Sequence, residues 1–560
     1  MSVLQRANEA VKLHGDEDKH EKTDSWSNRD LIPLPPARRT WGLFEYFGYW
    51  SLSSLNISAW QMPNSYLTVG LSVGQSMGVI IVSRAIVCLF ASLVAWCGLR
   101  WHIGFTIQNR FSWGMRGSYI PLIQRVMLNF IWNAIQCWNG GKLVCVCITA
   151  IFPSFASMKN TLPSSMPTTT YEMVGFTIFW FCSLPFLWLP PEKFRLPFQV
   201  ICIYCGVAMV CMMIWALAVA KGVGSTFHTG QNLTGSWSIN WVMLKCINSA
   251  IGGKAAGMTN GSDFSRYGKT AREYLIGTFL CLFCTGTMVS FVGLVTVSAT
   301  QKIYGEVYWN PPDLLMRMME DGQGSSKARA GVFFLALGFA LTAGFENICG
   351  NAVAGGIDLA GIFPKYINIK RGAMITFFAA WICMPWQLVN RADTFITVLS
   401  SFTVFLAPIM GIMTTDYFIL RRQRIRLSSL FDLHGQYYYN FGFNWRTPLA
   451  WVAGWAPLIA GLNATVQKTT VARPLFQLYY MSFFIGFSIS AILFYALNML
   501  FPPPHLGEFD EIDLFGTFTP EEAKYIGVVP ADDKVYDDNS SASGKVVFGD
   551  KVSEADLEYR

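Results

Sequence analysis

Charged residues are scarce in this sequence. Lysine, arginine, aspartate and glutamate account for 14% of its 560 residues, whereas about a quarter of an ordinary soluble domain is charged. Hydrophobic residues account for 52% and gather in long runs, for example at 200–220 and 275–299. Runs of about 20 apolar residues cross the hydrocarbon layer of a bilayer as helices. The shortage of charge therefore excludes an ordinary soluble domain and predicts an all-α integral membrane protein.

Residue groupings typical of enzymes are also missing. The chain contains 6 histidines, and it has no His-Glu-x-x-His metal motif, no nucleophile elbow and no phosphate-binding loop. Two cysteine pairs with C-x-x-C spacing, Cys202 with Cys205 and Cys281 with Cys284, have no histidine nearby, which disfavours zinc and redox chemistry. We therefore expect neither an enzyme nor a metal site, and we interpret the cysteines as small buried hydrophobic residues.

No apolar leader precedes the first apolar run. Residues 1–40 are polar, so we expect them to stay on the chain as a cytoplasmic tail. Residues 504–560 form a second polar and acidic segment without apolar periodicity, and we expect it to be a largely disordered cytoplasmic tail. This second tail is either an address for trafficking or ubiquitylation machinery or simply a solvated end.

The apolar runs between the tails, at 41–503, predict a transmembrane domain of about twelve helices. Their predicted starts lie near Phe44, Gln75, Ile120, Tyr171, Pro197, Asn240, Ala271, Ala328, Arg371, Ala392, Pro448 and Phe476. Lysine and arginine gather in the loops after the second, sixth, eighth and tenth helices, on the side of both tails, which the positive-inside rule makes cytoplasmic. This spread of basic residues disfavours a nucleic-acid partner. The sequon at 232–234 falls on the opposite side.

Two predicted helices contain polar residues and helix breakers in the middle of the membrane. The first helix contains the run 56–65 (NISAWQMPNS), and the sixth contains 249–257 (SAIGGKAAG). Interrupted helices at matching positions indicate an inverted repeat with a solute site at the bilayer midplane. The spacing therefore predicts a five-plus-five repeat followed by two extra helices. The alternative is that the glycines only permit close packing of helices.

Polar residues in these helices suggest the chemistry of the site. Lys254 lies within the second interruption, where an ammonium group costs several kcal/mol unless it lines water or is paired. Trp132 and Gln136 are four residues apart and share one face of the third helix, and the eighth helix adds Glu346 and Asn347. An indole, two carboxamides and an ammonium group can stack on and hydrogen-bond a planar heterocycle. Taken singly, each amide could equally hold helices together.

Three longer motifs resemble one family of transporters. They stand at 132–141 (WNAIQCWNGG), 260–267 (NGSDFSRY) and 355–372 (GGIDLAGIFPKYINIKRG). They are similar to the fungal branch of the nucleobase-cation-symport family, and the similarity runs over about 41–503. The resemblance implies the fold of the sodium-leucine transporter and proton-coupled import of a nucleobase or related ring compound, such as uracil, allantoin, uric acid or uridine.

The resemblance also implies roles for individual residues. Trp132 is expected to stack on the solute, Gln136 and Asn347 to read its amide edge, and Lys254 to contact a carbonyl oxygen. Phe395, at the start of the tenth helix, is expected to act as an outer lid, with ordinary apolar packing as the alternative.

The coupling ion is inferred from a departure from the family pattern. Sodium-coupled relatives carry paired hydroxyls before the asparagine of the eighth helix, whereas here Thr342 is present and Leu341 replaces the neighbouring serine. The resemblance therefore implies a proton as the coupling ion and no other cofactor. The candidate intramembrane carriers are Glu45, Glu346 and Asp358, and for each of them a structural ion pair is the alternative.

Two alternative functions stay open. Similarity at 304–309 and 518–523 favours a thiamine or nicotinamide riboside permease of the same family, whereas Lys254 with Gln136 favours the nucleobase branch. A nutrient sensor without transport activity could use the same pocket. In each case the expected partners are a small-molecule solute and the lipid bilayer, and family members mostly work at the plasma membrane.

Overall fold

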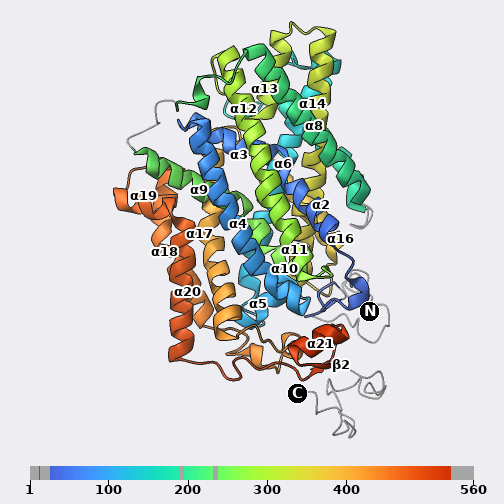
Figure 1. The fold of residues 1–560 in the computed structure, drawn as a ribbon, viewed down its shortest axis with the longest axis vertical. Coiled ribbons are helices and arrows are strands. Elements are labelled where there is room, and N and C mark those ends of the chain that lie inside the picture. The colour runs from blue at the N-terminus through green and yellow to red at the C-terminus, as the bar shows by residue number, and fades with distance from the viewer. Residues whose placement is uncertain (1–11, 13–25, 29, 189–194, 231–236, 531–560) are drawn as a thin grey trace.

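The computed structural model describes residues 12, 26–28, 30–188, 195–230 and 237–530, which form an elongated bundle of helices (Figure 1). Nine helical segments of this described part are long and apolar enough to cross a membrane. They contain α4 (Val73–Trp101), α6 (Tyr119–Ile151), α7 (Thr170–Ser183), α8 (Arg195–Ala220), α12 (Gly286–Tyr304), α14 (Ser326–Glu346), α17 (Ala392–Thr414), α18 (Arg446–Gln467) and α20 (Ser482–Leu500). The other three predicted spans are the pair α2 (Leu43–Ser54) and α3 (Ile57–Thr68), helix α9 (Ile239–Thr259) and helix α16 (Ile369–Phe378).

Shorter elements connect or extend these helices. The α-helical ones are α5 (Phe105–Trp113), α10 (Gly261–Ser265), α11 (Ala271–Thr278), α13 (Pro311–Asp321), α15 (Ala354–Ile362), α19 (Arg473–Tyr480) and α21 (Pro520–Ile526). Three π-helical segments, η6 (Phe279–Thr285), η7 (Asn347–Val353) and η10 (Thr415–Leu420), lie within spans. The 3-10 turns are η1 (Pro36–Arg38), η2 (Pro153–Phe155), η3 (Leu184–Trp188), η5 (Ser225–Phe227), η8 (Ala379–Trp381), η9 (Pro385–Gln387), η11 (Ser428–Leu430) and η12 (Gln436–Tyr438).

The helix starts confirm the predicted order of spans. Eleven of the twelve predicted starts lie within two residues of an observed helix start. The twelfth, Phe476, lies in the short helix α19, and the membrane-length helix α20 begins only at Ser482. Apolar run length therefore locates the spans well, because a helix must be about 20 residues long to cross the bilayer.

The first helix is interrupted, as the sequence predicts. Helix α2 ends at Ser54 and α3 begins at Ile57, and the side chain of Asn56 caps α3 by accepting the backbone N–H of Ala59 at 2.7 Å. The break stands at the start of the run 56–65, and the rest of that run is helical, with Pro63 inside α3.

The predicted interruption at 249–257 is wrong. Helix α9 continues without a break to Thr259, and the chain departs from it only at Asn260, before α10. A Cβ atom on Gly252 would lie 2.0 Å from the carbonyl oxygen of Leu399 in α17. The glycine therefore permits close packing of α9 against α17, which is the alternative reading of this motif.

The C-terminal segment is folded as far as residue 530, so the expectation of disorder is wrong for 505–530. Its two short strands, β1 (Ile512–Asp513) and β2 (Val529–Pro530), pair in parallel, and Thr519 caps α21 between them. Figure 1 shows α21 and β2 at the end of the molecule opposite to α13. We call this end, where Arg39 near the N-terminus pairs with Glu522 at 2.7 Å, the tail-side end. The sequon at 232–234 and residues 531–560 lie outside the described residues.

The pair formed by Arg39 and Glu522 makes the docking of the C-terminal segment depend on pH. Burial alone would raise the pKa of Glu522, but the nearby imidazole of His102 and hydrogen bonds from Arg39 and the backbone N–H of Thr519 lower that pKa to about 2. A lowered pKa in the folded state stabilises docking above about pH 4, the ordinary value for glutamate, and this stabilisation is lost as the pH falls toward 2.

We expect the variant Glu522→Gln to loosen the C-terminal segment at neutral pH. Cleavage within 505–530 by a dilute protease should become about fivefold faster, because a partly exposed charged contact contributes about 1 kcal/mol. Limited proteolysis of the purified protein measures this rate. The neighbouring exposed carboxylate Glu521 provides the control, and an equal effect of Glu521→Gln would contradict the role of the ion pair.

Candidate solute site

A cavity of about 80 Å³ lies in the interior of the bundle, where α2 ends and α14 passes into the π-helical segment η7. Five residues singled out from the sequence line it: Trp132, Gln136, Lys254, Glu346 and Phe395. The remaining lining residues are Tyr49, Trp50, Ser53, Ser58, Ala59, Met62, Gly253, Ala256, Gly257, Asn260, Cys349, Gly350, Asn351 and Leu399. The fold thus brings most of the predicted site to one place.

Helix α6 contributes an aromatic ring and an unpaired hydrogen-bond acceptor to the cavity lining. The indole of Trp132 lies 5.7 Å from the ring of Phe402, measured between centroids, and only 8% of the residue is exposed. The side-chain N–H of Gln136 donates to the carboxylate of Glu346. The other amide atom, Oε1 of Gln136, is buried and has no hydrogen-bond partner among the described residues. An N–H group of a solute could satisfy this oxygen, because an unpaired buried acceptor is costly.

The side chain of Lys254, which belongs to α9, reaches the C-terminal end of α2. Its ammonium group donates to the backbone oxygen of Ser53 at 2.5 Å and to the Ser53 hydroxyl at 2.7 Å. The last carbonyl groups of a helix lack partners within the helix and carry a partial negative charge, so the early end of α2 creates this cation site. No carboxylate of the described residues lies within 4.0 Å of the ammonium group, although Glu346 lines the same cavity.

Three further polar atoms of the cavity lining are buried without a hydrogen-bond partner in the described part of the chain. They are the indole Nε1 of Trp50, the hydroxyl of Ser58 and Oδ1 of Asn260. The sequence analysis placed Ser58 in the run 56–65 and Asn260 in the motif 260–267, but it assigned none of the three residues to the solute site. Each stands within six residues of the end of α2 or α9, so proximity to a helix break was the signal that could have found them.

Asn347 does not line the cavity but contacts a residue that does. Its Nδ2 group donates to Oδ1 of Asn133 at 2.9 Å, and its Oδ1 accepts a hydrogen bond from Asn351 at 2.9 Å. It is Asn351, one turn later in the π-helical segment η7, that lines the cavity. A π-helical turn rotates side chains relative to a regular helix and is frequent at functional sites. The structure therefore places Asn347 in contact with a lining residue and not in the lining itself.

Two of the residues predicted for coupling lie away from the cavity. The carboxylate of Glu45 accepts the backbone N–H of Gly42 at 2.9 Å and so caps the start of α2. The hydroxyl of Thr342 donates to backbone oxygens of its own helix, at 3.0 Å to Phe339. Both side chains are thus engaged in helix structure.

Asp358 belongs to a buried ion-pair cluster toward the tail-side end. Arg125 of α6 donates to Asp358 of α15 at 2.8 Å and to Asp263 of α10 at 2.7 Å, and all three side chains are fully buried. Asn129 also donates to Asp358, at 2.9 Å. Asp263 in addition accepts the backbone N–H of Phe105 at 2.9 Å. Three helices are therefore joined by one arginine on this side of the cavity.

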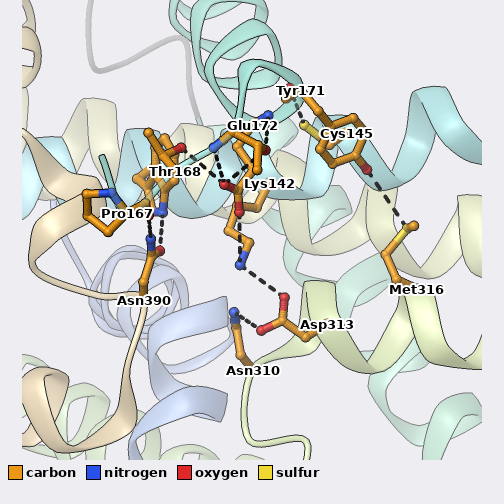
Figure 2. A network of polar contacts seen from close by, with 12 residues as sticks. Lys142, Cys145, Pro167, Thr168, Tyr171, Glu172, Asn310, Asp313, Met316 and Asn390 are labelled. Carbon is orange, nitrogen blue, oxygen red and sulfur yellow. Dashed lines mark hydrogen bonds and ion pairs between the residues drawn. The ribbon is translucent and has the colours of Figure 1, made fainter. Parts of the chain in front are cut away.

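A second polar network lies beyond the opposite side of the cavity (Figure 2). Lys142 of α6 pairs with Asp313 of α13 at 3.0 Å and with Glu172 of α7 at 3.7 Å. Asn310, which precedes α13, donates to Asp313 at 2.9 Å and accepts a hydrogen bond from Gln61 of α3 at 2.9 Å. Asn139 of α6 donates to Gln61 at 3.1 Å. These contacts hold α13 against α3 and α6.

Comparison with known proteins identifies the family. The sequence profile described as "Permease for cytosine/purines, uracil, thiamine, allantoin" matches residues 33–486. The chain is 33% identical to the transporter aclS of Aspergillus oryzae, over 94% of both chains. It is 34% identical to the thiamine transporter THI72 of Saccharomyces cerevisiae, over 90% of this chain and 84% of that one.

This chain belongs to the nucleobase-cation-symport family. Its fold is similar to that of Mhp1, a nucleobase-cation-symport-1 family transporter solved in a closed conformation with bromovinylhydantoin bound. The TM-score is 0.66 at 20% identity, and the match covers 89% of this chain and 99% of Mhp1. The likeness confirms the predicted five-plus-five fold with two extra helices. The protein is a multi-pass membrane transporter of this family.

Proposed function

We propose that this transporter imports a small planar nitrogenous ring compound, of the class of uracil, allantoin, uric acid or uridine, together with a proton. The observation that carries the proposal is the unpaired Oε1 atom of Gln136 beside the indole of Trp132, with the ammonium group of Lys254 in the same cavity. A plasma-membrane location, which follows the resemblance to the family, and an orientation with both termini in the cytoplasm, which follows the positive-inside rule, belong to the proposal.

The lining matches the edge and the face of such a ring. A ring N–H group can donate to Gln136, and a ring carbonyl oxygen can accept from the ammonium group of Lys254 or from the indole N–H of Trp50. Trp132 offers a flat face, and aromatic stacking contributes about 0.5–1.5 kcal/mol beyond the area buried. A hydrogen bond to a charged donor contributes about 1.5–3 kcal/mol. The donors and acceptors of the cavity thus complement an amide-like edge.

Charge in the cavity favours a neutral solute over a cation. Glu346 and Lys254 both line it, so their charges offset each other. A thiamine-like cation is the second candidate, because Glu346 offers it a carboxylate and because a thiamine transporter is among the relatives. Such a cation would also meet Lys254, and like charges repel within a site shielded from water.

We assign the proton to Glu346. Its carboxylate lies at the cavity next to Gln136 and has no basic partner within 4.0 Å among the described residues. Asp358 is held by Arg125, and Glu45 caps a helix. Glu346 is therefore the candidate carrier whose protonation can respond to solute in the cavity.

We propose that two polar networks close the cavity toward the two ends of the bundle, so that alternating access can open one at a time. The network of Gln61, Asn139 and Asn310 closes the side of α13, and the cluster of Arg125, Asp263 and Asp358 closes the tail-side. We propose that solute enters when the first network opens and leaves when the pair of Arg125 and Asp263 separates.

Breaking the first network should expose the cavity on the side of α13. We expect Gln61→Leu to increase the rate at which an impermeant thiol reagent labels Cys349, which lines the cavity, at least about fivefold. Each lost buried hydrogen bond weakens the closed state by about 1 kcal/mol. A background in which Cys349 is the single cysteine reports this rate, and Asn463→Leu at an exposed amide is the control. Equal labelling in both variants would contradict this gate.

Uptake of radiolabelled uracil tests the proposed function. We would express the protein in cells without their own permeases, at two external pH values, with allantoin, uric acid, uridine and thiamine as competitors. Uptake should rise at acidic pH and be lost in Gln136→Leu, but persist in Gln124→Leu, which changes an amide on the same helix outside the cavity. Competition by thiamine alone would favour the second candidate. Surface expression without uptake of any of these solutes would overturn the proposal and favour a sensor.

A further inference from the structure

A second, larger cleft of about 820 Å³ opens at the tail-side end of the bundle. Its lining includes residues just before the start of α6 and just past the end of α20. Its lining includes Arg116, Arg426, His434, Gln436, Tyr438 and His505. The transport cycle described above makes no use of these residues.

Two polar side chains in this cleft, Arg116 and Gln436, have no ion-pair or hydrogen-bond partner among the described residues. The guanidinium group of Arg116 lies 5.9 Å over the ring of Tyr438, and no carboxylate stands within 4.0 Å of it. Both polar side-chain atoms of Gln436 are buried and have no hydrogen-bond partner in the described part of the chain. Arg426, in contrast, pairs with Asp510 at 3.4 Å. The lining carboxylate of Asp432 accepts the backbone N–H of His434 at 2.8 Å.

The rim of the cleft carries aromatic residues that face outward. Phe441 is 83% exposed and has φ of +54°, a left-handed conformation that costs a non-glycine residue energy. The next residue, Gly442, has φ of +91°, and a Cβ atom there would lie 2.7 Å from Cγ of Arg116. The turn thus places the side chain of Arg116 against Gly442, the residue next to the exposed Phe441. Strained turns of this kind persist where the surrounding structure imposes them and cluster at functional sites.

The position of this rim matches the boundary of a bilayer. Helix α18 begins at Arg446, and α20 ends at Leu500, which is 72% exposed, followed by Phe501, which is 53% exposed. Exposed aromatic residues at the ends of membrane-spanning helices mark the level of the lipid headgroups. The cleft therefore opens where phosphate groups of lipids lie.

We propose that this cleft binds the headgroup of an anionic phospholipid, with the phosphate at Arg116 and the acyl chains beside Phe441. Basic pockets between membrane helices on the cytoplasmic side bind such headgroups. Gln436, His434 and the hydroxyl of Ser429 can supply further donors for the oxygens of the headgroup, whereas the hydroxyl of Ser428 already donates to Asp510. The exposed phenylalanine next to the arginine favours a lipid over a soluble phosphate, because only a lipid covers both.

Native mass spectrometry of the full-length protein in detergent tests this site, with phosphatidylinositol 4-phosphate as the probe and phosphatidylcholine as the neutral lipid. We expect one tightly retained anionic lipid, and about fivefold weaker retention in Arg116→Gln, since one basic side chain contributes about 1 kcal/mol. The control is Arg473→Gln, an exposed arginine stacked 4.7 Å over Trp237 at the opposite end of α18. A second variant, Phe441→Ser, should also weaken lipid retention without changing solute uptake.

Three outcomes would overturn the proposal. The first is equal retention of phosphatidylcholine, and the second is an equal effect of the Arg116 and Arg473 variants. The third is displacement of the lipid by inositol 1,4-bisphosphate at the same concentration, which would indicate a site for a free phosphate compound. If Arg116→Gln fails to fold, unchanged lipid retention in the folded Phe441→Ser protein is the contrary result.

Discussion

Replacement of Lys254 by methionine is expected to lower solute uptake, measured as kcat/KM, by about 10- to 100-fold. Among the described residues that line the cavity, Lys254 alone has a basic side chain, and a hydrogen bond to a charged group contributes about 1.5–3 kcal/mol. Methionine keeps the length of the side chain and removes its charge. Initial rates of uracil uptake over a range of concentrations, normalised to the protein at the cell surface, measure the effect.

The same helix provides a matched control for Lys254. Lys245 is also in α9, but its ammonium group lies 5.5 Å from the ring of Tyr480, outside the solute cavity. Lys245→Met should therefore transport almost normally. If Lys254→Met kept its uptake, or lost uptake only in proportion to its surface expression, the role of Lys254 would be limited to holding the end of α2 through Ser53.

Replacement of Arg125 by methionine is expected to have the largest effect on stability, about 3–5 kcal/mol. The substitution leaves the carboxylates of Asp263 and Asp358 buried without their cation, and removing one partner of a buried ion pair carries this penalty. Thermal unfolding of the purified protein in detergent measures the loss as a lower melting temperature.

Two comparisons make the Arg125 prediction specific. Arg391→Met removes an exposed arginine that pairs with exposed Asp393, and such surface pairs contribute about 0–1 kcal/mol. Adding Asp263→Asn and Asp358→Asn to Arg125→Met should restore part of the lost stability, because the uncompensated charges disappear. A single Arg125 variant as stable as the Arg391 variant would contradict the proposed closure.

The order of spans could be predicted from the sequence because hydrophobic run length is a direct physical requirement of the bilayer. The structural role of the glycines in the run 249–257 could not be predicted in this way. The run at 249–257 reads as a break, yet Gly252 serves the close approach of α9 and α17. Glycine makes a backbone more flexible, and it also permits the close approach of another backbone. The contact with Leu399 shows that close approach is the role of Gly252.

Buried charged residues show a similar limit of prediction from the sequence, now for the candidate site. The rule that an intramembrane charge is functional singles out Lys254, but it applies equally to Arg84 and Arg125, which our reasoning left aside. Arg84 is buried in α4 and donates to the backbone oxygen of Leu282 at 3.3 Å, within the π-helical segment η6. The sequence shows that a charged residue lies within an apolar span. Its partners come from distant helices, so its role depends on the tertiary structure.

The polar C-terminal segment was misjudged for the same reason. It lacks apolar periodicity, but Phe518 packs against Trp101 with ring centroids 5.7 Å apart, and Glu522 meets Arg39. These contacts join segments that are far apart in the chain, and single-sequence patterns report only local structure.

The pairing of Arg39 with Glu522 also bears on how the protein is made. The two residues are 483 positions apart, so the ribosome has synthesised nearly every membrane helix before the second partner emerges. Until then, Arg39 and the surface around Trp101 stay uncovered on the nascent chain. A chain that is truncated, or whose last helices insert the wrong way round, can never cover them. The closing contact therefore distinguishes finished molecules from incomplete ones.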